Sequence, residues 1–279
     1  MIGPDVVART MSETRAIGKT RALWQYHSRS DHHSQLFCFA IAVDLLATSS
    51  LMRTHAREGK ITIGVNHEMA DFRRDQKKNL DLVIARPADS ASAAGTKATT
   101  LGAIASKIGA RMTPPQQAEF DALPAIEKRP VGAVLVALEA KACMTEHIKS
   151  MPRMYDELHS SQLIVHGAAD QAIAVGLAII NVAPTFVSPL LPAGTVTSHK
   201  QPTVTETMIA KMRKLPRRTS PGEVGFDAFG IMVINLTNDG ASAVTVATDA
   251  PAPQPTDSDT YAAMILRTAS LYDYRFSSI

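Results

Sequence analysis

Residues 131–141, Val-Gly-Ala-Val-Leu-Val-Ala-Leu-Glu-Ala-Lys, decide the fold that this sequence predicts. The stretch is apolar up to Glu139 and reads as a β-strand, in which successive side chains point to opposite faces of a sheet. A period of two places Glu139 and Lys141 on the same face as Leu135 and Ala137. A carboxylate and an ammonium at the end of a strand that is otherwise fit for burial need a chemical reason.

A second apolar strand, residues 79–84 (Asn-Leu-Asp-Leu-Val-Ile), carries Asp81. Carboxylates from two strands would give hard oxygen ligands to Mg²⁺, which takes one or two carboxylates and keeps several waters. Such an ion lowers the pKa of an attacking water and offsets charge at a phosphate. Lys141 would position that water and shield the growing negative charge. Asp81, Glu139 and Lys141 therefore predict a metal site for phosphodiester hydrolysis.

The elements around these strands predict an α/β fold. A long apolar helical stretch at 33–58 begins after Ser30-Asp31, which are good capping residues, and ends at Gly59. A second helix, with Ser150 as its cap and Pro152 in its first turn, is expected near 150–163. The remaining core elements are strands, and they are expected at 61–65, 80–85, 131–142 and 172–182.

This order, with an aspartate on one strand and Glu-x-Lys on the next, resembles the PD-(D/E)xK nuclease superfamily. The restriction-endonuclease-like fold of that family has an αβββαβ core, and the resemblance covers about residues 31–183. It implies a central mixed β-sheet flanked by helices. It also implies that Asp81, Glu139 and the backbone carbonyl of Ala140 bind Mg²⁺, for which Mn²⁺ can substitute, while Lys141 assists the attacking water. Leu80 stands where the family usually has proline.

The gap between the two acidic strands is long, which predicts an insertion at about 87–129 with a short helix at 115–123. Asp89 and Asp121 in this insertion compete with Asp81 for the role of metal ligand. An alternative for Asp81 is that it merely ends a hairpin after a polar turn at residues 75–79.

Two further acids are candidate metal ligands, Asp44 on the first helix and Glu68 near the end of the first strand. The alternative for Asp44 is capture by an arginine, since an unpaired buried charge is costly. The alternative for Glu68 is a plain turn residue. Glu139 and Lys141 themselves have an alternative as an exposed ion pair that contributes little.

Basic side chains near the acidic strands and in the C-terminal part are candidate phosphate contacts. One of them has an equally good alternative, because Arg153 and Glu157 are spaced to form an i, i+4 ion pair. The net charge of +3 permits DNA binding without requiring it. The candidate DNA-binding residues are Lys77, Lys78, Arg153, Arg217 and Arg218.

Other motifs give little support to other chemistries. Asp31-His32-His33 matches the signature of the DHH phosphoesterases, but the polar residues before it form no strand, so 24–35 reads as a helix entry. The remaining histidines have no HxxxH or HxH spacing, and the chain has no Walker loop and no GxGxxG.

Composition predicts a single nuclease domain over residues 1–279 with a C-terminal α+β extension at 184–279. In this extension a helix is expected at 204–214, two strands joined by Asn238-Asp239-Gly240 and a final helix at 258–272. Two cysteines, Cys38 and Cys143, make a disulfide framework improbable and indicate a cytoplasmic protein. The apolar run at 172–183 is too short to cross a bilayer.

The sequence therefore predicts a Mg²⁺-dependent DNA endonuclease that resembles type II restriction enzymes. As the resemblance implies, its partners are double-stranded DNA and a second copy of the chain in a homodimer. One alternative is a structure-specific or repair nuclease of the same fold. Another is a non-catalytic nucleic-acid-binding or assembly protein that retained the fold.

Overall fold

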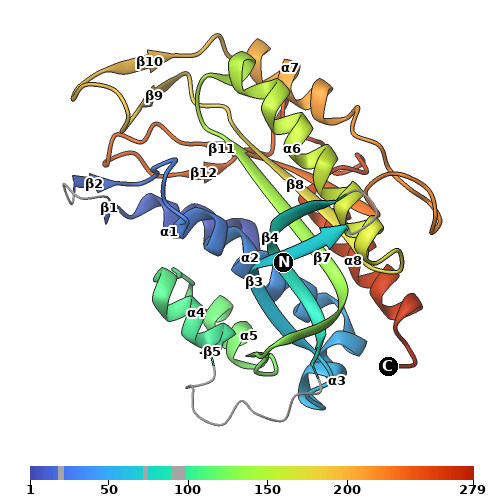
Figure 1. Cartoon of the computed structure of the whole chain (residues 1–279). Helices are drawn as coiled ribbons and strands as arrows, with labels where there is room; N and C mark the ends of the chain where they lie inside the picture. The colour runs from blue at the N-terminus through green and yellow to red at the C-terminus, as the bar shows by residue number, and fades with distance from the viewer. Residues whose placement is uncertain (18–21, 72–74, 89–98) are drawn as a thin grey trace.

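The structure is a computed structural model that describes residues 1–17, 22–71, 75–88 and 99–279. In this part of the chain a six-stranded mixed sheet forms the centre of an α/β fold, with helices on both faces (Figure 1). The predicted central mixed sheet with flanking helices is thereby confirmed. In spatial order its strands are β12 (Thr245–Val246), β11 (Ala228–Asn235), β8 (Ile173–Asn181), β7 (Val131–Cys143), β4 (Gln76–Pro87) and β3 (Thr62–Asp71).

Strands β7, β8 and β11 run parallel, whereas the pairs β3–β4, β4–β7 and β11–β12 are antiparallel. Strand β8 lies at the middle of this arrangement, and all nine of its residues are buried. Its side chains alternate between two apolar clusters, with Val175 in one and Ala174 in the other. The prediction of a strand buried on both faces at 172–182 is correct.

The helices form two layers. One face of the sheet is covered by helices that share a cluster with Leu138 and Val175, and the other by helices that share a cluster with Ala137 and Ala174. The first layer contains α1 (Gly3–Ser12), α2 (His32–Thr48), α3 (Ser50–Arg57) and α8 (Tyr261–Arg275), and the second contains α6 (His147–Ala168) and α7 (Thr203–Met212).

The single helix predicted at 33–58 is wrong, because Ser49 divides it into α2 and α3. Ser49 has an extended backbone, and its Oγ accepts a hydrogen bond from Met52 N at 2.9 Å, so it caps a new helix. The axes of the two helices differ by 103°. Among the described helices, none is by itself long and apolar enough to cross a membrane. The bent pair α2 and α3 reaches the required length and apolar character only when the two helices are taken together.

The hairpin of β3 and β4 is longer than predicted. Residues 76–79 are not a turn but the first residues of β4, and they pair with β3 from Asp71↔Gln76 onward. Because β3 is an edge strand, polar side chains here can remain in solvent while the backbones pair. Helix α6 likewise begins at His147 rather than near 150, so Pro152 lies inside it and not in its first turn.

The C-terminal segment extends the same sheet. Strand β11 pairs with β8 in parallel and β12 pairs with β11, while α7 and α8 lie close to their predicted positions. Small elements complete the described chain. They are the hairpins β1 (Arg15–Ile17) with β2 (Ala22–Trp24) and β9 (Thr185–Val187) with β10 (Val196–Ser198), and in the insertion β5 (Thr99–Thr100), α4 (Leu101–Ile108), α5 (Pro114–Asp121) and β6 (Glu127–Lys128).

Candidate active site

The predicted acids meet where strands β4 and β7 separate. Pairing between the two strands ends at Leu82↔Leu138, while β4 goes on pairing with β3 and β7 goes on pairing with β8. One further step along the two strands brings Asp81 to the level of Glu139, and the Asp81 carboxylate turns toward α2 and the backbone of β7. We call Asp81 and residues 139–141 the fork.

Asp81 is held from two sides at the fork. Its Oδ1 accepts a hydrogen bond from Ser34 Oγ of α2 at 2.8 Å. Its Oδ2 accepts one from the backbone N–H of Ala140 at 2.9 Å, a donor that no longer has a partner in the backbone of β4. These two bonds fix the orientation of the carboxylate without a metal ion.

Glu139 is the most deeply buried charge of the fork, with 1% of its side chain exposed. Its Oε1 lies 2.7 Å from Lys141 Nζ and 3.4 Å from Lys78 Nζ. Its Oε2 is buried and has no hydrogen-bond partner among the described residues. Burial, and then the charge of Asp81, raise the pKa of Glu139 against the opposing effect of the two lysines.

Helix α6 contributes a third carboxylate to this group. Glu157 Oε2 lies 3.7 Å from Lys141 Nζ. Burial alone would lower the pKa of Lys141, but the neighbouring Glu139 outweighs it and the pKa is raised. Lys141 is therefore a cation at neutral pH, placed between Glu139 and the helix.

The donor set of the fork fits Mg²⁺ or Mn²⁺. Two carboxylates and the carbonyl of Ala140 are hard oxygen ligands, and an unpartnered buried carboxylate oxygen is the kind of atom that a cation satisfies. Within the described ranges no cluster of three or more His, Cys, Asp or Glu side chains is placed to hold a metal ion. An ion held by so few protein ligands would keep several waters, as Mg²⁺ commonly does.

Asp44, a tentative metal ligand, is engaged elsewhere. Its buried carboxylate accepts hydrogen bonds from Ile2 N at 2.8 Å, Gly3 N at 3.0 Å and Tyr261 Oη at 3.0 Å. Ten residues along α2 separate it from Ser34, which is about 15 Å of helix. Among the described residues no arginine pairs with Asp44, because the start of α1 and a tyrosine supply the donors.

The other candidate acids are exposed or lie outside the described chain. Glu68 belongs to β3 rather than to a turn, and its carboxylate pairs with the exposed Lys77 at 3.2 Å. Asp121 lies at the end of α5 and accepts a hydrogen bond from Gln117. Asp89 lies outside the described residues. The structure thus brings Asp81, and neither Glu68 nor Asp121, close to the backbone beside Glu139.

Two of the five candidate DNA contacts form ion pairs within the protein. Arg218 is buried against Asp227 at 3.0 Å and Asp170 at 3.3 Å, so its prediction as a DNA contact is wrong. A guanidinium with its counter-ions inside the protein cannot reach a phosphate. Arg153 pairs with Glu157 at 2.6 Å, which confirms the i, i+4 alternative.

The remaining three candidates differ in position. Arg217 lies with its guanidinium carbon 4.1 Å from the centre of the Phe229 ring. Lys77 is exposed, whereas Lys78 is a member of the site itself through its contact with Glu139. Of these three, Lys77 has an exposed ammonium, which pairs with the equally exposed Glu68.

The histidines of the Asp31-His32-His33 motif face the protein interior. His32 Nε2 lies 2.9 Å from Ile108 O and His33 Nε2 lies 2.9 Å from Gln25 O. These contacts fasten the start of α2, the helix that carries Ser34. Ser34 and Glu157 were missed as site residues because only their tertiary contacts distinguish them from other helix residues.

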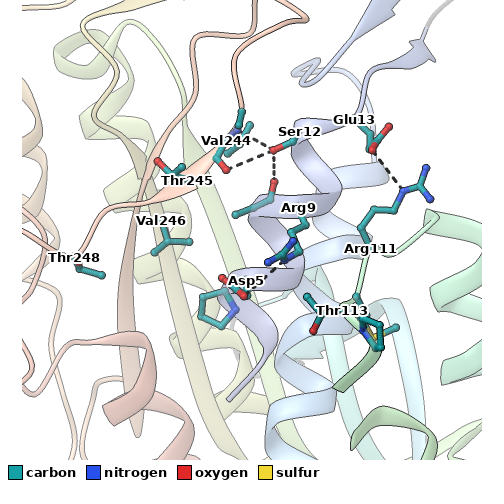
Figure 2. A pocket seen from close by; sticks show the side chains of 15 residues that line it. Asp5, Arg9, Ser12, Glu13, Arg111, Thr113, Val244, Thr245, Val246 and Thr248 are labelled. Carbon is teal, nitrogen blue, oxygen red and sulfur yellow. Dashed lines mark hydrogen bonds and ion pairs between the residues drawn. The ribbon is translucent and has the colours of Figure 1, made fainter. Parts of the chain in front are cut away.

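A cavity of about 1050 Å³ lies away from the fork. It lies between α1, residues 111–114 and residues 243–248, and Figure 2 shows that its charges are already paired. Arg9 contacts Asp5 at 3.8 Å and Arg111 contacts Glu13 at 3.7 Å. This cavity holds no group with the chemistry found at the fork.

Comparisons of this chain with protein-family models, with curated proteins and with solved structures found no match. The fork itself is therefore the basis for a functional conclusion.

Proposed function

We propose that this protein is a Mg²⁺-dependent endonuclease that hydrolyses phosphodiester bonds in double-stranded DNA, like the type II restriction enzymes. One observation carries the proposal. Asp81 accepts a hydrogen bond from the backbone N–H of Ala140, the neighbour of Glu139; the buried Oε2 of Glu139 has no hydrogen-bond partner among the described residues, and Lys141 Nζ lies 2.7 Å from Oε1 of the same carboxylate. Two lysines neutralise this carboxylate, and its oxygen without a hydrogen bond leaves a position at which a cation could bind.

Asp81 and Lys141 have different roles in the proposed reaction. A bound cation would supply an activated water and offset charge on the phosphate. Asp81 is orientated in advance by Ser34 and the Ala140 N–H, so little reorganisation is needed when a ligand arrives. Lys141 keeps its charge beside Glu139, where an ammonium can orientate water and stabilise negative charge on a phosphate.

DNA as substrate and a homodimer as the working form are parts of the same proposal. The support for them is the element order, helix α2, strands β3, β4 and β7, helix α6 and strand β8, with the acids at the positions that the PD-(D/E)xK resemblance requires. A dimer would bring two such sites to the two strands of a duplex.

The test is incubation of the purified protein with supercoiled and linear DNA, with Mg²⁺ or with EDTA. We expect cutting only with Mg²⁺, and discrete fragments if the enzyme recognises a sequence. Asp81→Asn and Lys141→Met should each abolish cutting and leave DNA retention in a gel-shift assay. Asp121→Asn, an exposed acid in α5, is the matched control and should cut normally. Retention without any cutting would instead favour a non-catalytic nucleic-acid-binding protein.

A further inference from the structure

A second lysine, Lys78, lies beside Glu139 without a role in the proposed chemistry. Its Nζ is 3.4 Å from Glu139 Oε1, and only 17% of its side chain is exposed. We infer that Lys78 is a built-in counter-ion of Glu139 that opposes divalent-cation binding until a phosphate enters the fork. The inference rests on the proposed function, because it concerns the same metal site.

Helix α6 fixes the ammonium of Lys78 in place. Its Nζ donates to the carbonyl oxygen of Glu157 at 2.5 Å and to Ser160 Oγ at 3.2 Å. The backbone of Lys78 is held as well, because it pairs with Met69 in the β3–β4 hairpin. A lysine anchored at both ends cannot swing into solvent when another cation approaches.

The charges at the fork are balanced without a metal ion. Asp81, Glu139 and Glu157 carry three negative charges. Lys78, Lys141 and Arg153 carry three positive charges, and Glu157 contacts both Lys141 and Arg153. A divalent ion therefore meets two fixed ammonium groups within the same small volume. Like charges a few ångströms apart at a partly buried site repel one another strongly.

A phosphate relieves this repulsion. Once Glu139 binds a divalent ion, it neutralises Lys78 and Lys141 less completely. The negative charge of a phosphate would compensate both the ion and these ammonium groups. The free protein should therefore bind Mg²⁺ weakly, and metal and DNA should bind cooperatively. Such an enzyme would bind its metal ion mainly when DNA is already present in the site.

The direct test is the affinity of the free protein for Mn²⁺, measured by calorimetry or by the electron paramagnetic resonance signal of unbound Mn²⁺. Lys78→Met should bind Mn²⁺ about tenfold more tightly than the wild type, because a fixed positive charge is removed. Lys78→Arg, which keeps the charge, should resemble the wild type. Lys77→Met is the matched control, since the neighbouring ammonium is exposed and pairs with Glu68, and its Mn²⁺ affinity should not change.

A merely structural role of Lys78 predicts the opposite sign. If Lys78 only supported Glu139, Lys78→Met would weaken Mn²⁺ binding, and that result or an unchanged affinity would overturn the inference. A wild type that cuts DNA while Lys78→Met binds Mn²⁺ no better refutes the inference alone. If neither protein binds Mn²⁺ and the wild type does not cut DNA, the proposed function fails as well.

Discussion

The hydrogen bond between Ser34 and Asp81 offers a precise test of how the fork is built. Ser34→Ala removes the Oγ that lies 2.8 Å from Asp81 Oδ1 and leaves the second bond, from Ala140 N, in place. The substitution changes one oxygen atom on a half-buried helix position. The fold should therefore be kept, and the carboxylate should lose one of its two restraints.

The size of the effect follows from the kind of bond that is lost. A hydrogen bond to a charged group contributes about 1.5–3 kcal/mol when its partner cannot be replaced. Asp81 is only partly buried, so water can replace part of the interaction, and we expect the low end of that range. A rise of about 1.4 kcal/mol in the barrier is a tenfold loss in kcat.

The assay is steady-state cleavage of a DNA substrate at saturating Mg²⁺, with kcat and KM determined separately. We expect Ser34→Ala to lower kcat about tenfold with little change in KM, and Ser34→Thr, which keeps a hydroxyl, to restore most of the rate. Ser106→Ala, an exposed serine of α4, is the control. A Ser34→Ala enzyme with wild-type kcat, or a Ser34→Thr enzyme as slow as the alanine variant, would refute this account of Asp81.

Two further predictions concern stability. Asp227→Asn should lower the free energy of unfolding by about 3–5 kcal/mol in urea titrations, because it leaves the buried Arg218 and Arg275 without their shared counter-ion, whereas the exposed Asp257→Asn should cost less than about 1 kcal/mol. An equal effect of the two substitutions would contradict the burial argument. Burial lowers the pKa of His33 to about 4, below its ordinary value of 6.5, so its stabilising contribution is present above pH 6.5 and lost as the pH falls towards 4. This loss amounts to about 3 kcal/mol, and His33→Gln should flatten the measured pH dependence of unfolding across that window; an unchanged slope would contradict the assignment.

The core elements could be predicted because their signals are local. The apolar run of β8 specifies a strand buried on both faces, and residues 131–141 specify the strand β7. The face of each side chain in β7 was predicted only in part, because Leu135 and Ala137 lie in different apolar clusters. Asp81 was matched to Glu139 because the PD-(D/E)xK resemblance pairs an aspartate on one strand with Glu-x-Lys on the next. These features need no knowledge of distant contacts.

Other features depended on contacts that the sequence does not show. The sequence around Ser49 is continuous enough in apolar residues to predict one helix. The chain breaks there because Ser49 caps a second helix through its hydrogen bond with Met52 N. Arg218 reads as part of a basic surface cluster, but the return of residues 216–227 to the start of β8 buries it against Asp227. Asp44 was predicted near the metal only because it lies on the first core helix. In the structure its carboxylate accepts hydrogen bonds from backbone N–H groups at the start of α1.

The most direct measurement of the central claim is a crystal structure of the protein soaked in Mn²⁺, with anomalous diffraction used to locate the ion. The account predicts one peak at the fork, about 2–2.3 Å from oxygens of Asp81, Glu139 and the Ala140 carbonyl, and its loss in Asp81→Asn. Adding a short DNA duplex should raise the occupancy of this peak. A fork without a peak at saturating Mn²⁺ and DNA, or a peak bound only elsewhere on the chain, would contradict the account.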